Sequence, residues 1–446
     1  MSGRRYLALD AADALAGAFL AGEWDPPAMA RRAQRALGDR RGWTLELARV
    51  VRAGFPERPA DRPRELAGFI GRCEVFHRAV QDPDRPMRVR VWMAPPTEMG
   101  PARWPVAPLP DVAALATWLG VTVDHLAWFA DRRSLERHVD DERLRHYRRR
   151  WLAKPDGTAR LLEAPKNELK DLQRQVLHQI LDRIPAHDAA HGFRPNRSVR
   201  TSAAVHRGQE VVVRLDLEAF FTSVDVGRVY GIFRLAGYPE PVAHTLAALC
   251  VTVTPGAVLR SAPPVPDSLV DARRRLLHRL RSPHLAQGSP TSPALANLVA
   301  FRLDRRLAGL AAALDARYTR YADDLVLSGG RNLVRSAGPI LHLVERIARS
   351  EGFTVHDRKT RVLTSAQRQR ITGLVVNGGV NVARPDYDRL RAVLHDAALH
   401  GPEAANREGH PDFQAHLQGR VAWVGAGNPG RAHKLARAFA AIDWDA

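Results

Sequence analysis

Two adjacent aspartates, Asp323 and Asp324, are the residues of this chain whose type and spacing most directly suggest chemistry. The residues on either side, 319–321 and 325–328, have the pattern of two β-strands, which predicts a hairpin with the acidic pair at its tip. Neighbouring carboxylates in a partly buried place repel each other unless a cation neutralises them. A solvated acidic turn is the ordinary alternative for two aspartates alone. A metal site therefore needs partners elsewhere in the chain.

A third carboxylate, Asp216, ends a strongly apolar run at 211–217 that predicts a buried strand. Strands far apart in sequence can be neighbours in an antiparallel sheet, so Asp216 could meet the acidic pair. Three converging carboxylates suit two Mg²⁺ ions, because hard cations prefer oxygen ligands. Two such ions about 3.5–4 Å apart can activate a 3′-hydroxyl and stabilise departing pyrophosphate. The chemistry indicated is phosphoryl transfer, which depends mainly on positioning and charge neutralisation.

The charge of the chain points to a polyanionic partner. Its 446 residues include 67 Lys and Arg against 48 Asp and Glu, a formal net charge of +19. Nucleic acid is the commonest partner of so basic a protein, and no long basic amphipathic helix favours a membrane surface instead. No apolar run approaches the ~18 residues that span a membrane. Cys73 and Cys250 fit neither a disulfide framework nor a zinc site, which predicts a reducing, cytoplasmic location.

Basic residues gather in a few segments. Arg148, Arg149 and Arg150 lie between Tyr147 and Trp151, a combination that suits phosphate contacts with aromatic stacking. A solvated helix face would have a similar composition. Further arginines, Arg194 and Arg197, occupy a turn-rich segment at 191–198, and Lys166 begins a helical pattern with further cations at intervals of four residues. These residues are candidates for contacts with a nucleic acid or a triphosphate.

The elements that must position these side chains are visible in the periodicity of the sequence. Residues 1–110 predict an accessory helical region that ends in a proline-rich stretch. Residues 252–286 are rich in Pro, Arg and His, and predict an inserted arm or a long loop. Residues 287–293, which include Gln287 and Gly288, form a tight polar turn before an apolar helix, where small residues allow close approach of a ligand or simply cap the helix. A final apolar strand is expected at 371–377, followed by a helical tail.

At this point the chain resembles the reverse transcriptases, and among them the bacterial retron-type enzymes. The matching motifs occur in the family's order from about residue 112 to the end: Arg160 with 164–166, 191–193 with 197–198, 215–216 with 220–221, 287–293, 321–324, and 359–360. The resemblance implies an α+β fold, a right-hand polymerase with an antiparallel palm sheet backed by helices. It also implies the following boundaries: an N-terminal mainly helical extension at 1–110, fingers and N-terminal helices at 111–210, a palm at 211–380 containing the arm, and a helical thumb at 381–446.

The resemblance also implies roles for the acidic residues. Asp216, Asp323 and Asp324 match the catalytic metal ligands, with two Mg²⁺ ions as cofactor and Mn²⁺ as a substitute. Asp323 is expected to coordinate directly, Asp324 more peripherally, and the hairpin tip is expected to need a cation. Lys359 matches a lysine that protonates the leaving pyrophosphate.

Other matched positions would contact the substrate. Arg160 and Lys166 are expected to meet the incoming triphosphate. Phe221 lies where the family places the bulky residue that excludes a ribose 2′-hydroxyl, which favours dNTPs over NTPs. Gln287 and Gly288 would support the nucleotide and the nascent base pair.

For a retron enzyme the resemblance implies a structured RNA that serves as primer and template, dNTPs, a nascent DNA joined to RNA, an effector protein and a role in antiphage defence. Two retron-specific segments depart from the family's pattern, since Ser202 replaces an asparagine and Ile371 a valine. Alternatives are another prokaryotic reverse transcriptase of the group II intron type, an RNA polymerase on the same palm, which Phe221 disfavours, and a non-catalytic RNA-binding protein or maturase.

Overall fold

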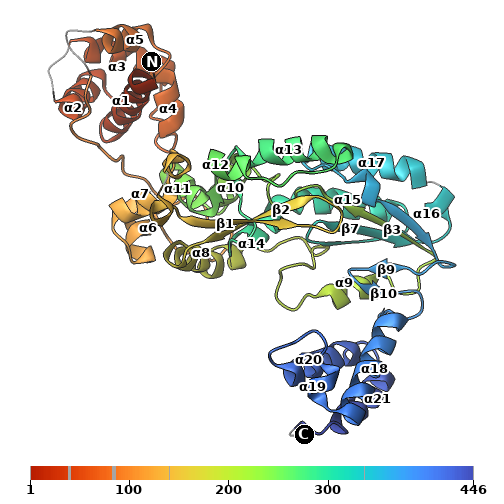
Figure 1. Ribbon diagram of the computed structural model, residues 1–446. Coiled ribbons are helices and arrows are strands. Elements are labelled where there is room, and N and C mark those ends of the chain that lie inside the picture. The colour runs from red at the N-terminus through yellow and green to blue at the C-terminus, as the bar shows by residue number, and fades with distance from the viewer. Residues whose placement is uncertain (1, 39–41, 83–86, 140, 336, 445–446) are drawn as a thin grey trace.

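The computed structural model describes residues 2–38, 42–82, 87–139, 141–335 and 337–444. The N-terminal helices lie at one end, the C-terminal helices at the other, and a body of sheets and helices lies between them (Figure 1). Among the described residues, no single helix has the length and apolar character to cross a membrane, although the bent pair Val112–Leu119 and Val123–Ala130 meets that test jointly.

The N-terminal region is a bundle of helices with its own core. Its sequence supplies ordinary helix ends: the Asp25 side chain caps α2 by accepting from Ala28 N, and Gly38 ends α2 in the left-handed conformation with a φ of 67°. Leu15, Phe19 and Leu47 are fully buried in this core. The helices are α1 Ser2–Leu20, α2 Pro26–Leu37, α3 Trp43–Gly54, α4 Pro63–Ile70 and α5 Glu74–Gln81.

The fingers begin with helices that pack on the body and continue into a β-hairpin. Strands β1 and β2 pair antiparallel, with Tyr147 opposite Pro165. The Ser198 side chain caps α9 and forms a capping box with Thr201. The elements are α6 Val112–Leu119, α7 Val123–Ala130, η1 Leu135–His138, η2 Glu142–Leu144, β1 Tyr147–Ala153, β2 Ala159–Pro165, α8 Asn167–Gln179, η3 Leu181–Arg183 and α9 Val199–Val205.

The palm is built on an antiparallel sheet of four strands in the order β6-β7-β3-β8. Its inner strand β3 has buried residues on both faces, and helices cover the sheet, which agrees with the predicted α+β fold with an antiparallel sheet backed by helices. The palm elements are β3 Val211–Asp216, α10 Val226–Leu235, α11 Glu240–Cys250, β4 Val251–Thr252, α12 Gly256–Arg260, η4 Asp267–Leu269, α13 Val270–Leu280, β5 His284–Leu285, α14 Ser292–Val299, α15 Phe301–Ala313, β6 Arg317–Tyr321, β7 Asp324–Gly329, α16 Asn332–Arg335, α17 Ala337–Ser350, η5 Asp357–Lys359 and β8 Arg361–Thr364.

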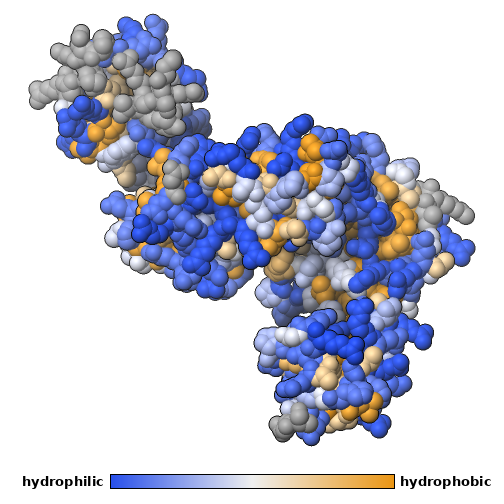
Figure 2. All heavy atoms as spheres, in the orientation of Figure 1, coloured by the Kyte–Doolittle hydropathy of each residue, from blue (hydrophilic) through white to orange (hydrophobic). Residues whose placement is uncertain are grey.

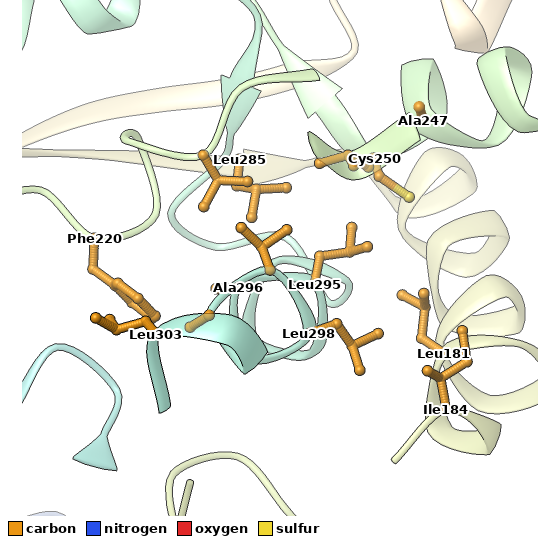
Figure 3. Close-up of a cluster of buried hydrophobic side chains, with 14 of the residues drawn as sticks. Leu181, Ile184, Phe220, Ala247, Cys250, Leu285, Leu295, Ala296, Leu298 and Leu303 are labelled. Atoms are coloured by element: carbon orange, nitrogen blue, oxygen red, sulfur yellow. The ribbon is translucent and has the colours of Figure 1, made fainter. Parts of the chain in front are cut away.

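The main hydrophobic core links the palm to the fingers. Helix α14 lies at its centre, with Phe220 on one side and Leu181 and Ile184 of the fingers on the other (Figure 3). Phe220 is 4 % exposed and follows closely after Asp216 in the chain, so the core holds the backbone that carries this carboxylate. The packing therefore fixes the end of β3 rather than leaving it in a free loop.

In this part of the molecule the structure decides between two sequence alternatives and corrects one expectation. Residues 252–286 are an arm that contains α12 and α13 rather than a long loop. The single strand expected at 371–377 is two short strands, because Thr372 and Gly373 have φ values of 44° and 91° and turn the chain. These strands pair with β11 in a separate small sheet, in the order β11-β10-β9, with bounds β9 Arg370–Ile371, β10 Leu374–Val375 and β11 Asn381–Val382.

The C-terminal region, which the resemblance predicts to be a thumb, consists of helices. Its core includes Leu390, Leu394 and Leu417, together with Val212 and Val326 from one face of the palm sheet, so the thumb is packed on the palm. The thumb helices are α18 Arg384–His400, α19 Pro402–Ala405, α20 Phe413–Gly425 and α21 Pro429–Ala440. The face of the molecule in Figure 2 is largely hydrophilic, which suits the basic composition.

Candidate active site

The palm sheet brings the three aspartates to one edge. Asp216, the last residue of β3, lies directly opposite Asp324, the first residue of β7. Asp323 occupies the hairpin turn, and its carbonyl oxygen accepts a 2.9 Å hydrogen bond from Leu217 N. Tyr321 pairs with Asp324 across the turn, and Ala322 has a φ of 55°, which closes the hairpin. The predicted hairpin tip and the predicted neighbour strand are therefore both present.

The electrostatics of this edge are unfavourable for anions. Burial, reinforced by the charge of Asp216, raises the pKa of Asp323 above its ordinary value. Burial raises the pKa of Asp324 to about 6, and Asp323 and Asp216 add to the increase, although Arg214 lies 3.8 Å away and opposes it. The raised pKa values show that the ionised carboxylates are unfavourable here, so a nearby cation would stabilise them.

Lys359 already provides one such cation. Its Nζ lies 2.9 Å from Asp216 Oδ1, and the lysine is 44 % exposed. The backbone near it is fixed, because His356 N donates to Asp216 O at 2.7 Å and η5 follows. The resemblance gave Lys359 a role near the leaving group, and the structure places it beside the first carboxylate.

The residues fit a hard divalent cation by their donor chemistry. Asp216 and Asp323 both line one cavity of about 340 Å³, and their oxygens are ligands that Mg²⁺ prefers. Asp324 is not among the residues that line this cavity, in keeping with a peripheral position. Within the described ranges, no group of three or more Asp, Glu, His or Cys side chains lies close enough together to hold a metal ion as it stands.

The cavity brings together the other predicted substrate contacts except two. Phe221 forms a wall beside the aspartates, and Gln287 and Arg160 face the same space. Lys154, which lies between β1 and β2, also lines it, and burial together with the Arg160 charge lowers the pKa of this lysine. Gly288 is outside the lining set; its φ is 131°, and a Cβ there would lie 3.0 Å from Glu163 O, so glycine lets the turn pack against the fingers strand.

Lys166 does not face the cavity, which corrects the expectation of a triphosphate contact. Its Nζ donates to the carbonyl oxygens of Glu142 at 2.6 Å and Arg143 at 3.1 Å. The lysine begins a helix after β2, and its side chain follows the surface back to η2. It therefore ties two segments of the fingers together.

The three consecutive arginines of β1 are divided by the alternation of a strand. Arg149 is buried between Glu136 and Glu163, at 2.9 Å and 3.0 Å, and its side chain is 3 % exposed. This position corrects the expectation that Arg149 contacts nucleic acid, because its Nη1 and Nε groups are already paired with buried carboxylates. Arg148 and Arg150 are exposed and stay candidates for such contacts.

The arginines of the turn-rich segment are partly engaged in the fold. Arg194 Nη1 donates to the carbonyl oxygens of His187 and Ala190, at 2.8 Å and 3.1 Å. Arg197 lies 3.9 Å from the Asp188 carboxylate, and its side chain is 35 % exposed. Arg194 therefore has a structural role, whereas Arg197 is free enough to meet a phosphate.

Sequence reasoning missed the buried arginine that supports the hairpin. Arg320 is fully buried and donates through Nε and Nη2 to Asp304, at 2.8 Å and 2.6 Å. Its Nη1 donates to Asn297 Oδ1 at 2.9 Å and to Ala322 O at 3.1 Å, so it holds the turn itself. An arginine within a predicted buried strand needs a partner, which is the signal that could have identified it.

The segment around Gly192 closes the other side of the hairpin. His191 N donates to Arg320 O, and Arg320 N donates to Ala189 O. A Cβ on Gly192 would lie 2.8 Å from Ala322 N, so only glycine allows this approach. Phe193 lies near Phe221 and Tyr321, with ring centroids 6.2 Å and 6.4 Å away. The second matched motif thus contacts the acidic turn directly.

Comparison with known proteins agrees with this geometry. Residues 152–376 match the family model for reverse transcriptase (RNA-dependent DNA polymerase). Retron Mx65 reverse transcriptase from Myxococcus xanthus is 42% identical over 328 residues, which cover 73% of this chain and 70% of that protein. Retron Mx162 reverse transcriptase from the same organism is 38% identical, over 72% of this chain and 65% of the relative. Retron Ec86 reverse transcriptase from Escherichia coli is 30% identical, over 54% and 66%.

Proposed function

Because this chain belongs to the reverse transcriptase family and is a retron-type RNA-directed DNA polymerase, we propose that it copies a cognate structured RNA into a single-stranded DNA that stays joined to that RNA. The names of the similar proteins support the retron assignment. The RNA would act as primer and template, dNTPs would be the substrates, and antiphage defence together with an effector protein would be the biological context.

The observation that carries the proposal is the shared cavity of Asp216 and Asp323. Its lining includes two carboxylates, a bulky aromatic wall at Phe221 and the cationic side chains of Lys154 and Arg160. Asp216 and Asp323, with Asp324 beside them, would hold two Mg²⁺ ions, or Mn²⁺ in their place. When bound, such ions supply charge neutralisation for the attacking and leaving oxygens.

The side chains of this chain would do the rest of the work. Phe221 would exclude a ribose 2′-hydroxyl by its bulk, and Arg160 and Lys154 would hold triphosphate oxygens in place. Lys359, which is 2.9 Å from Asp216, would give a proton to the departing pyrophosphate after the carboxylate takes up a metal ion. Arg148, Arg150 and Arg197 are exposed positions for phosphate contacts.

Primer extension on an RNA template tests the proposal. With Mg²⁺ and dNTPs the protein should extend the primer, and NTPs should give little product. Asp323→Asn removes one ligand charge without changing side-chain size, so we expect a loss of about a thousandfold or more in rate. Asp271→Asn, at a side chain that is 79% exposed on α13, is the matched control and should keep the activity.

Two results would overturn the proposal in different ways. Full activity of Asp323→Asn would contradict the metal assignment. Salt-sensitive RNA binding without any nucleotide incorporation would favour a non-catalytic RNA-binding protein. Recovery of a structured RNA covalently joined to DNA from the expressed protein would support the retron product.

A further inference from the structure

The inserted arm forms part of the wall of the active-site cavity. Helix α13 carries four arginines, whereas its apolar residues Leu276 and Leu280 pack toward the fingers strand β2 at Leu161. Trp151 Nε1 donates to Val258 O at 3.1 Å and ties the other arm helix, α12, to β1. The arm is thus anchored to the fingers and presents one basic edge to the catalytic aspartates.

Two arginines of α13 line the active-site cavity, Arg279 and Arg273, and Arg273 Nη2 already donates to Ala262 O at 3.0 Å. Arg279 lines the same cavity as Asp216 and Asp323, and its side chain is 22% exposed. Its contacts are long: Nη1 lies 4.0 Å from Glu218 Oε2, and Nη2 lies 3.5 Å from Thr354 Oγ1. Glu218 also lies 3.4 Å from Arg275. The Arg279 guanidinium is therefore confined in the cavity without a close, bidentate partner, in contrast to Arg320.

The backbone pairing places Arg279 relative to the catalytic carboxylate. Glu218 N donates to Thr354 O at 2.8 Å, and His356 N donates to Asp216 O at 2.7 Å. Two residues of chain span at most about 7 Å, so the backbone of Glu218, whose side chain contacts Arg279, lies within about that distance of Asp216. A triphosphate whose reacting phosphorus lies at the aspartates extends away from them over a distance of this order. The guanidinium would then meet the outer phosphates.

We propose that Arg279 of the inserted arm binds the outer phosphates of the incoming nucleotide, and that Glu218 holds its guanidinium until a nucleotide enters. The inference rests on the proposed function, because it takes Asp216 and Asp323 as the reacting centre. Arginine suits this task, since its planar fork matches phosphate oxygens. The arm thereby becomes a third source of cations, beside Arg160 and Lys154 of the fingers and Lys359 of the palm.

Steady-state kinetics with dNTP as the varied substrate test this role. Arg279→Gln should raise KM for dNTP about tenfold, the effect of losing one charge-assisted hydrogen bond, and leave kcat within about twofold. The inhibition constant of inorganic pyrophosphate should rise by a similar factor. Arg279→Lys keeps the charge but not the planar guanidinium, so its KM for dNTP should lie between those of Arg279→Gln and the wild type. Arg274→Gln, on the same helix but 78% exposed, is the control and should change neither constant.

Glu218→Gln tests the holding contact. Because it weakens the competitor for the guanidinium, this variant should lower KM for dNTP by about twofold. A rise in KM would overturn the idea that Glu218 holds Arg279 in reserve.

Three outcomes would overturn the role of Arg279. They are unchanged KM and pyrophosphate inhibition, a loss of RNA affinity in place of the change in KM, and a fall in kcat and melting temperature at constant KM. If the wild type incorporated no nucleotide, the proposed function would fail instead. Equilibrium binding of a dNTP to the wild type and to Arg279→Gln would still test whether Arg279 binds phosphate, and the variant is expected to bind more weakly.

Discussion

Two cation–carboxylate pairs, each with one member on the palm sheet, differ in how deeply they are buried. Arg320 and Asp304 are both completely buried and share two short contacts, and Arg320 also holds Asn297 and the turn carbonyl of Ala322. Lys359 and Asp216 share one contact at 2.9 Å, with 44% and 15% of their side chains exposed. Loss of one partner of the first pair would leave the other charge buried without its counterion, which destabilises the fold. The second can be exchanged for another cation, and this difference separates the support of the site from its chemistry.

The largest expected effect comes from the buried pair. Asp304→Asn leaves the charge of Arg320 buried without its counterion, which should lower the free energy of unfolding by about 3–5 kcal/mol. Urea denaturation measures this loss. The exposed control Asp271→Asn should change it by about 0.5 kcal/mol or less. If Asp304→Asn lowered the free energy of unfolding no more than the control does, the buried pair would contribute no more to stability than an exposed one, and the contrast between the two pairs would be wrong.

Replacement of both buried partners sharpens the same point. In Asp304→Leu with Arg320→Met no unpaired charge remains, so stability should recover by several kcal/mol relative to Asp304→Asn. The turn carbonyl of Ala322 loses its donor in this double variant, and primer extension should therefore stay weak although the fold recovers.

The second effect in size concerns pH and metal. The folded-state pKa of Asp324 is raised to about 6, above its ordinary value of 3.8, so the folded state binds the proton more tightly than the unfolded chain. This contribution to stability is complete below pH 4 and is lost as the pH rises through 6. Without divalent metal, the free energy of unfolding of Asp324→Asn should therefore match that of the wild type near pH 4 and exceed it at pH 7 by about 3 kcal/mol.

Chemical denaturation at several pH values, with a chelator or with Mg²⁺, checks this prediction. Mg²⁺ should narrow the gap between the variant and the wild type at pH 7, because the cation offsets the charge of the wild-type carboxylates. A gap that is independent of both pH and Mg²⁺ would mean that the folded state does not raise the pKa of Asp324.

The catalytic aspartates and Lys359 could be predicted from the sequence, whereas the buried Arg320–Asp304 pair could not. Asp216 ends an apolar strand, Asp323 lies in the hairpin turn and Asp324 begins the next apolar strand, a local pattern that can be recognised without knowledge of the fold. The family, the polymerase fold and the polymerase activity predicted from the motifs were confirmed, whereas the individual site roles stay predictions. Arg320 finds Asp304 only when α15 packs on β6, which depends on tertiary contacts that no local spacing encodes.

Arg149 illustrates the same limit from the other direction. A run of arginines resembles a solvated surface, but a strand turns alternate residues inward. Arg149 then meets Glu163, which lies opposite it on β2, and Glu136 of η1. The arm was recognised by composition, but its prolines and arginines concealed the helical period of α13. The strand expected at 371–377 was wrong because the backbone turns at Thr372, a conformation that a threonine rarely adopts.

The smallest expected effect concerns Lys359. An ion pair this exposed contributes little to the free energy of unfolding, so Lys359→Met should lower it by about 0.5 kcal/mol or less without metal. The ammonium and a metal ion compete for the same Asp216 oxygen, and the variant should therefore reach half-saturation in a Mg²⁺ titration at a concentration about twofold lower. Lys434→Met on α21 of the thumb, distant from the aspartates, should leave that concentration unchanged. A higher concentration for Lys359→Met would show that the lysine assists the metal site instead of standing in for its cation.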